Sequence, residues 1–192
     1  MSSNPSYILS VLPAIDRYPI ALRLLHWIRA LLIFGLIAAG WLMTSLNDAT
    51  PIKYATLYPL HKSVGLLVFA LVLTQLVLRV CSPLPETPVG LKVWERRFSK
   101  AVHVLMYVLL IIVPLMGYAM SSSYTMSDGV TFFGLHVPEL LPKDDGRFKV
   151  FQAVHKIAAY LLLALIGLHV AGAVKHRMFD KRGNTDVLAR ML

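Results

Sequence analysis

Seven histidines occur in this chain of 192 residues, and two of them, His155 and His169, lie fourteen residues apart in its last apolar segment. Fourteen residues are two heptads, so on an α-helix both imidazoles leave nearly the same face. At about 1.5 Å per residue, they are roughly 21 Å apart along the helix axis. An ionisable ring inside a membrane span is costly and is usually functional. The spacing therefore predicts two imidazole sites, one toward each side of a bilayer.

Two further histidines supply a partner at each depth. His26 lies about six residues, roughly 9 Å, into the first apolar segment, which is the depth of His169 from the same side. His61 lies near the start of the second segment, at the depth of His155. Depth alone leaves His103, in the third segment, as an alternative partner of His169. We predict an inner pair, His26 with His169, on the side of both termini, and an outer pair, His61 with His155.

The number of ligands at each depth favours haem. Imidazole suits iron, copper and zinc, but a structural zinc ion requires four ligands around one point. Haem supplies four nitrogens itself and requires only two axial ligands. Because Cys81 is the only cysteine, a C-x-x-C-H attachment motif is excluded. The expected cofactors are therefore two non-covalent haems b, each with bis-histidine ligation by His26 and His169 or by His61 and His155.

Four apolar segments carry these histidines. Hydrophobic residues make up 57% of the chain and charged residues 15%, with a mean hydropathy of +0.65, which is unusual for a soluble domain. Each segment, with its flanking turns, reaches the ~20 residues that a membrane helix needs. We predict an all-α membrane protein, a four-transmembrane-helix bundle binding two haems b. Its helices are expected near residues 20–45, 57–80, 100–122 and 149–176.

The predicted domains are an N-terminal segment, 1–19, the di-haem bundle, 20–176, and a C-terminal tail, 177–192. The first segment is polar and rich in proline, which does not fit a signal peptide. All ten acidic residues lie outside the four predicted spans, which disfavours a proton pump or a divalent-cation transporter.

Basic residues predict the orientation. The N-terminal flank, the connection between the second and third helices, and the tail hold thirteen of the nineteen Lys and Arg residues and five of the ten acids. That side carries a net charge of +8 and the opposite side +1. The positive-inside rule then places both termini in the cytoplasm. The net charge of +9 is thus explained mostly by topology, and no nucleic-acid partner is expected.

Further polar residues are expected at the inner side. His103 and His176 could bind a haem propionate or a quinone carbonyl, and Arg79 could neutralise a propionate. On the outer side, the longest loop, 124–149, contains an apolar stretch at 130–135. We expect this stretch to pack as a short lid over the outer end.

Each of the four segments carries a recognisable motif. These are Leu25-His26-Trp27, Leu60-His61-Lys62-Ser63-Val64-Gly65, Leu78-Arg79-Val80-Cys81-Ser82-Pro83, His103 with Pro114 and Gly117, and His155 with Gly167-Leu168-His169 and Lys175-His176. Together they resemble the bacterial cytochrome b561 family of four-helix, di-haem inner-membrane proteins, over roughly residues 18–192. The resemblance implies ligands from the first, second and fourth helices, which favours His26 over His103, and electron exchange with ubiquinone.

The expected function is transmembrane electron transfer between ubiquinone and a small-molecule or protein donor on the periplasmic side. The family includes a branch that oxidises superoxide, so a superoxide:ubiquinone oxidoreductase is one form of this function, although the pairs His61-Lys62 and His155-Lys156 differ from that branch. The alternative is a membrane-anchor cytochrome b subunit of a larger dehydrogenase or hydrogenase, which the short loops disfavour. A stoichiometric partner on purification would identify that alternative. A Soret band would distinguish both from a haem-free metal transporter.

Overall fold

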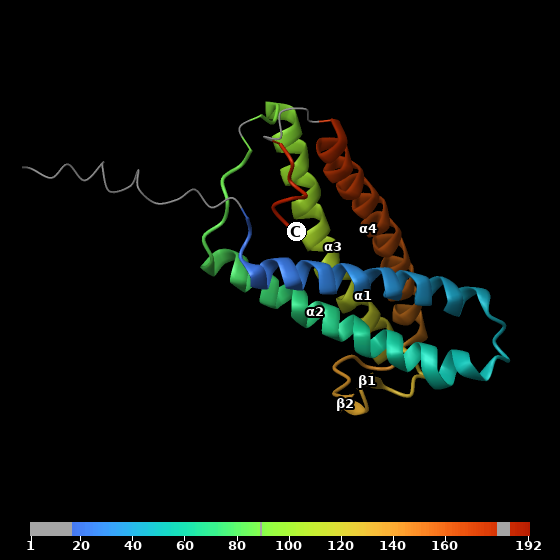
Figure 1. The fold of residues 1–192 in the computed structure, drawn as a ribbon. Coiled ribbons are helices and arrows are strands. Elements are labelled where there is room, and N and C mark those ends of the chain that lie inside the picture. The colour runs from blue at the N-terminus through green and yellow to red at the C-terminus, as the bar shows by residue number, and fades with distance from the viewer. Residues whose placement is uncertain (1–16, 89, 180–184) are drawn as a thin grey trace, which may run out of the picture.

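Four long helices make up most of the chain. This computed structural model describes residues 17–88, 90–179 and 185–192, so the predictions for residues 1–16 and 180–184 lie outside the described residues. The four helices, with the π-helical turn η2 that leads into the second, are long and apolar enough to cross a membrane, as the sequence predicts (Figure 1). Their bounds are Ile20–Ser45 for α1, Lys53–Leu57 for η2, Tyr58–Cys81 for α2, Val93–Ser123 for α3 and Asp145–Phe179 for α4.

Two helices begin earlier than the sequence predicts. α3 begins at Val93 rather than near residue 100, and the Glu95 carboxylate caps it by accepting a backbone N–H at 3.1 Å. α4 begins at Asp145 rather than near residue 149, and the Asp144 carboxylate accepts the next two free backbone N–H groups at 2.8 and 3.1 Å. These first turns are charged, because both helices continue beyond the apolar run that marks the membrane span.

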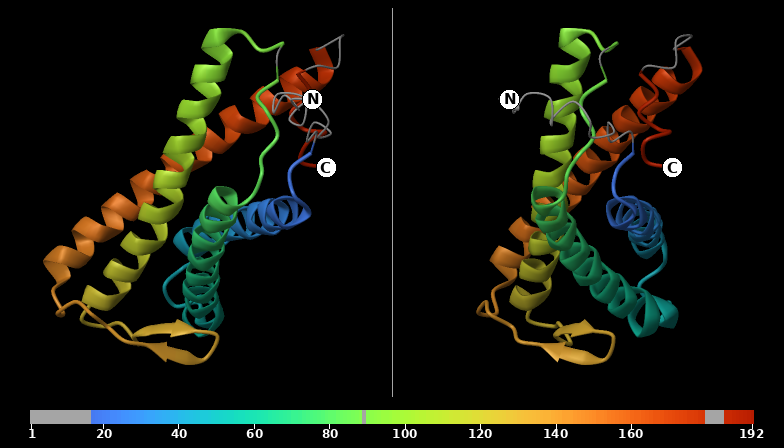
Figure 2. Two further views of the ribbon diagram at one scale, coloured as in Figure 1. Left: turned by 90° about the vertical axis from the view of Figure 1, so that its left-hand side faces the viewer. Right: turned by 60° about the vertical axis from the view of Figure 1, so that its left-hand side comes forward.

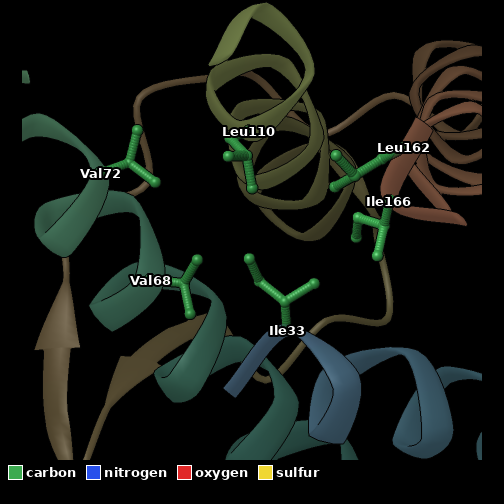
Figure 3. Close-up of a cluster of buried hydrophobic side chains, with 6 residues drawn as sticks. All are labelled: Ile33, Val68, Val72, Leu110, Leu162 and Ile166. Atoms are coloured by element: carbon green, nitrogen blue, oxygen red, sulfur yellow. The ribbon is translucent and has the colours of Figure 1, made fainter. Parts of the chain in front are cut away.

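The helices form two antiparallel pairs. α1 packs on α2, α3 packs on α4 along most of its length, and α2 also contacts α3. The two pairs cross at a marked angle (Figure 2). Side chains from all four helices meet at the crossing and point toward one another (Figure 3). This buried cluster lies midway between the two histidine levels and consists of Ile33, Val68, Val72, Leu110, Leu162 and Ile166.

The three segments with most basic residues meet at one end of the bundle. The Tyr18 backbone N–H donates to the Arg190 carbonyl at 3.1 Å, and Trp27 Nε1 donates to the Met191 carbonyl at 2.9 Å. The Arg190 guanidinium donates in turn to the Glu86 carbonyl in the connection between α2 and α3. The tail therefore joins the start of α1 to that connection, and we refer to this end as the inner end.

A short β-hairpin lies at the opposite, outer end. Strands β1 (Val130–Phe132) and β2 (Leu135–Val137) pair antiparallel, with Val130 opposite Val137. The two turn residues, Phe133 and Gly134, have φ values of 47° and 90°, as a tight hairpin turn requires. This hairpin occupies the stretch for which the sequence predicts an apolar lid, and it adds two strands to an otherwise helical fold.

Candidate functional site

The histidines meet in two pairs, one toward each end of the bundle. At the inner level, the ring centroids of His26 on α1 and His169 on α4 are 6.2 Å apart, with the rings inclined at 60°. At the outer level, those of His61 on α2 and His155 on α4 are 6.3 Å apart, with the rings inclined at 69°. The structure thus brings together the residues that the sequence pairs by depth, and α4 contributes to both levels.

The separation of the rings suits two axial ligands of one metal. A metal–imidazole bond is about 2.0 Å long, and a ring nitrogen lies roughly 1.2 Å from the ring centroid. Two imidazoles on opposite sides of a metal therefore have centroids about 6.4 Å apart. Rings in direct contact can show the same separation, so the distance between the helix backbones is the second test.

The backbones around these pairs stay apart although the rings approach. Helices that pack directly have axes about 8–10 Å apart. Within the described residues α4 packs in this way on α3, whereas its backbone barely approaches α1 or α2. Side chains therefore span most of the distance from α4 to the α1–α2 pair. A flat group between opposing imidazoles fits this arrangement.

The outer rings also have nitrogens that suit this interpretation. His155 Nδ1 lies 2.8 Å from the Val113 carbonyl, so it donates there and leaves Nε2 free to act as a ligand. His61 Nδ1 is buried and has no hydrogen-bond partner in the described protein. Buried nitrogens are normally paired, and a polar or coordinating atom beyond the described residues would pair this one. The four histidines fit a haem with two axial imidazoles at each level.

The same fourteen-residue spacing occurs on every helix. It joins one residue at the inner level to one at the outer level: His26 to Gly40, Gln75 to His61, His103 to Gly117, and His169 to His155. Both glycines lie beside an outer imidazole. A Cβ at Gly117 would lie 3.2 Å from two atoms of His155, and a Cβ at Gly40 would lie 3.9 Å from His61. Counting fourteen residues from each of the histidines on the other helices would also have identified Gly40, Gln75 and Gly117 from the sequence.

His103 lies against an inner ring but is bonded elsewhere. Its ring centroid is 5.1 Å from that of His169, closer than opposite axial ligands would be. Its Nδ1 lies 2.7 Å from the Ser99 carbonyl and donates to it. Of the two candidates that depth allows, His26 has the separation that suits an axial partner of His169.

The other predicted inner residues lie away from these rings. Arg79 is exposed, with its guanidinium 6.0 Å from the centroid of the Tyr18 ring. His176 is half-buried and interacts electrostatically with Glu95, which pairs with Lys175 at 2.6 Å. The described contacts therefore place both residues at the inner end without joining them to the histidine pair.

The hairpin is attached to α2 directly beside His61. Ser63 Oγ accepts the Phe133 N–H at 3.0 Å, and its single proton is shared between the Pro59 carbonyl at 2.9 Å and the Thr131 carbonyl at 3.1 Å. Lys62 Nζ donates to the carbonyl of Gly129 at 2.8 Å. Consecutive residues His61, Lys62 and Ser63 thus combine a candidate ligand with two anchors for the hairpin, a connection that sequence reasoning missed.

Comparisons with known proteins agree with this architecture. The family model described as prokaryotic cytochrome b561 matches residues 17–192. Cytochrome b561 homolog 2 of Escherichia coli (strain K12) is 30% identical over 182 residues, covering 92% of each chain. Cytochrome b561 homolog 1 of the same organism is 22% identical over 172 residues, covering 88% of this chain and 92% of the relative. A Yersinia pestis protein named probable superoxide oxidase CybB is 25% identical over 169 residues, covering 88% and 91%.

Proposed function

The chain belongs to the prokaryotic cytochrome b561 family, and from this premise we propose that it carries electrons through two haems b between a periplasmic donor and ubiquinone. Membership makes it a multi-pass bacterial membrane cytochrome of the b type with a role in electron transfer. The single observation that carries the finer proposal is the two-level pairing, with ring centroids 6.2 and 6.3 Å apart.

Each level has a distinct set of residues in this proposal. His26 and His169 hold the inner haem, and His61 and His155 hold the outer one. A bound haem b supplies a one-electron iron couple. A haem held by both imidazoles of a pair would favour electron transfer over oxygen binding. The Val113 carbonyl orients the His155 ring, and the glycines beside the outer rings leave room for a flat ligand.

Haem content tests this assignment. Purified protein should contain two non-covalent, low-spin haems b per chain, all extractable with acid-acetone. His61→Ala should lose only the outer haem, and His26→Ala only the inner one. His136→Ala is the matched control, because that residue lies in β2 and outside both pairs. A single haem in the unmodified chain, or two haems in His61→Ala, would contradict the proposal.

The quinone is assigned to the inner end. His103 lies against His169, and because its Nδ1 donates to the Ser99 carbonyl, the Nε2 of the neutral ring can accept a hydrogen bond from a quinol hydroxyl. His176 lies one heptad beyond His169, at the inner end of α4. Substituting His103 or His176 by leucine should slow reoxidation of the reduced protein by a short-chain ubiquinone without loss of haem. Unchanged rates in both variants, with a slower rate in Lys62→Gln, would place the quinone at the outer end instead.

Superoxide is the first donor to test, because one relative is named for its oxidation. Pulses of potassium superoxide should reduce the protein, and superoxide dismutase should abolish the reduction. An unreactive protein would point to a donor of another kind. If it also copurified with a stoichiometric partner, the membrane-anchor function would replace the present proposal.

We also propose an inner-membrane location with both termini in the cytoplasm, supported by the +8 charge of the inner end. Cys81 offers a direct test, because it is the only cysteine, is exposed and ends α2 at the inner end. A membrane-impermeant maleimide should label Cys81 in inverted vesicles and leave it unlabelled in spheroplasts. Labelling in spheroplasts alone would reverse the orientation.

A further inference from the structure

Arg29 is a buried cation inside a membrane span. It lies one helical turn beyond His26 toward the centre of the bundle and is 7% exposed. Its guanidinium carbon lies 5.7 Å from the centroid of the Tyr107 ring on α3, and its Nη1 is buried without a hydrogen-bond partner in the described residues. Arginine keeps its proton even when buried. A positive charge is therefore fixed between the two histidine levels.

Neighbouring helices hold this cation in place without neutralising it. Gln75 on α2 is 4% exposed, and its Nε2 donates to Tyr107 Oη at 3.5 Å. Gln75 is also the α2 residue that the fourteen-residue spacing places at the inner level, on the same face as His61. Of the three described inner-end acids, Glu86, Glu95 and Asp186, the last two pair with other cations, each at 2.6 Å. Among the described residues, no ion pair involves Arg29.

The charge acts on one histidine pair. Arg29 interacts electrostatically with the rings of both His26 and His169. At the outer level, Lys62 instead directs its Nζ to the Gly129 carbonyl, and Lys156, next to His155, is exposed. The inner and outer centres thus have similar ligands but different electrostatic surroundings.

We propose that Arg29 raises the reduction potential of the inner centre above that of the outer one, so that electron transfer runs downhill from the outer face to the inner face. This inference rests on the proposed function. Reduction adds one negative charge to the inner site, and a nearby cation in a low-dielectric interior stabilises that state. In the step, the outer centre loses one electron and the inner centre gains it, with no bond or proton transferred. The periplasmic donor supplies electrons and ubiquinone removes them.

Potentiometric titration of the purified haem-loaded protein tests this. His61→Ala, with its inner haem, and His26→Ala, with its outer haem, assign the two midpoints. The inner midpoint should be the higher one in the unmodified chain. Arg29→Gln should lower the midpoint potential of the inner haem by about 59 mV, which is a tenfold change in its one-electron reduction equilibrium. The outer midpoint should stay unchanged. Arg29→Lys, which keeps the charge, should retain most of the difference, and Arg96→Gln, at an exposed inner-end position, should change neither midpoint.

The outcomes separate the two proposals. Failure of the His61 and His26 variants to lose one haem each would contradict the proposed function. If both haems are confirmed and the inner midpoint of the unmodified chain is equal to or below the outer one, the role of Arg29 is overturned. This test does not depend on whether Arg29→Gln folds. An unchanged inner midpoint in a haem-replete Arg29→Gln protein would overturn it as well.

Discussion

Gly117 on α3 lies against the ring of His155, and we expect Gly117→Ala to weaken the outer centre. The added Cβ would lie 3.2 Å from both Cε1 and Nδ1 of that ring. Because carbon contacts are optimal at about 3.5–4.0 Å, the ring must retreat by a few tenths of an ångström. Its Nδ1 is bonded at 2.8 Å to the carbonyl of Val113, one turn earlier on the same helix. Moving the ring away from α3 therefore also stretches this hydrogen bond.

The magnitude follows from three effects. Overpacking of this kind costs about 1–3 kcal/mol, and a weakened hydrogen bond adds up to about 1 kcal/mol. Replacing glycine by alanine in a helix returns about 0.8–1 kcal/mol. The net loss is about 0–3 kcal/mol and about 1.5 kcal/mol at the middle of these ranges, so the affinity for the outer haem should fall about tenfold, and at most about 150-fold.

Haem titration of the apoprotein measures this affinity, and thermal unfolding measures the change in stability. Two glycines provide matched controls. A Cβ at Gly40 would lie 3.9 Å from His61, an ordinary contact, and one at Gly167 would have no neighbour within 4 Å. If the Gly117→Ala protein binds its outer haem as tightly as Gly40→Ala and Gly167→Ala do, the close contact does not position His155.

Three further perturbations test other contacts. His103→Ala should retain both haems, while His26→Ala should lose one. Loss of haem from the His103 variant alone would make His103, and not His26, the partner of His169. Ser63→Ala removes the acceptor of the Phe133 N–H, worth about 0.5–1.5 kcal/mol, and the proton shared with the Thr131 carbonyl, so hairpin amides should exchange hydrogen faster while the exchange in α3 stays the same. A hydrogen bond from Lys53 holds the pKa of the exposed Asp48 carboxyl below its usual value. Because a lowered pKa stabilises the fold above the unfolded pKa of about 4 and not below the lowered value, the melting temperature of Asp48→Asn should lie below that of the unmodified protein at pH 6. The two should converge as the pH falls below 4, and a constant difference would contradict the role of this bond.

The sequence predicts the four helices well, because each follows from a local run of apolar residues. In α1 the apolar run fills almost the whole helix. The helix predicted near residues 20–45 therefore agrees with the observed bounds, Ile20–Ser45. The start of α3 lies before the predicted residue 100, because its first two turns, from Val93, are charged and project beyond the apolar run. Hydropathy identifies the membrane-embedded part of a helix, whereas a cap such as Glu95 determines where the helix starts.

The choice among residues at one depth required the three-dimensional arrangement. His26 and His103 lie at similar depths, so the count of residues from the helix ends could not select one. Their separations from His169, 6.2 and 5.1 Å, depend on how the two helix pairs cross. The same limit applies to Arg29, whose burial against Tyr107 involves residues 78 positions apart. Periodicity places a residue on a face of its helix, but it does not identify the neighbour of that face.

The hydrogen bonds that Arg190 and Met191 make at the inner end have a consequence for biosynthesis. They can form only after the last residues of the chain have been made. Both residues follow α4 in the chain, and their partners include the flank of the first helix and the connection after the second. Translation must therefore pass all four helices before the inner end can close. Until then, Trp27, the neighbour of His26, lacks the Met191 carbonyl to which its indole nitrogen donates. A fusion joined directly to the tail would crowd this closure, so an affinity tag is better placed before residue 17 or behind a flexible linker.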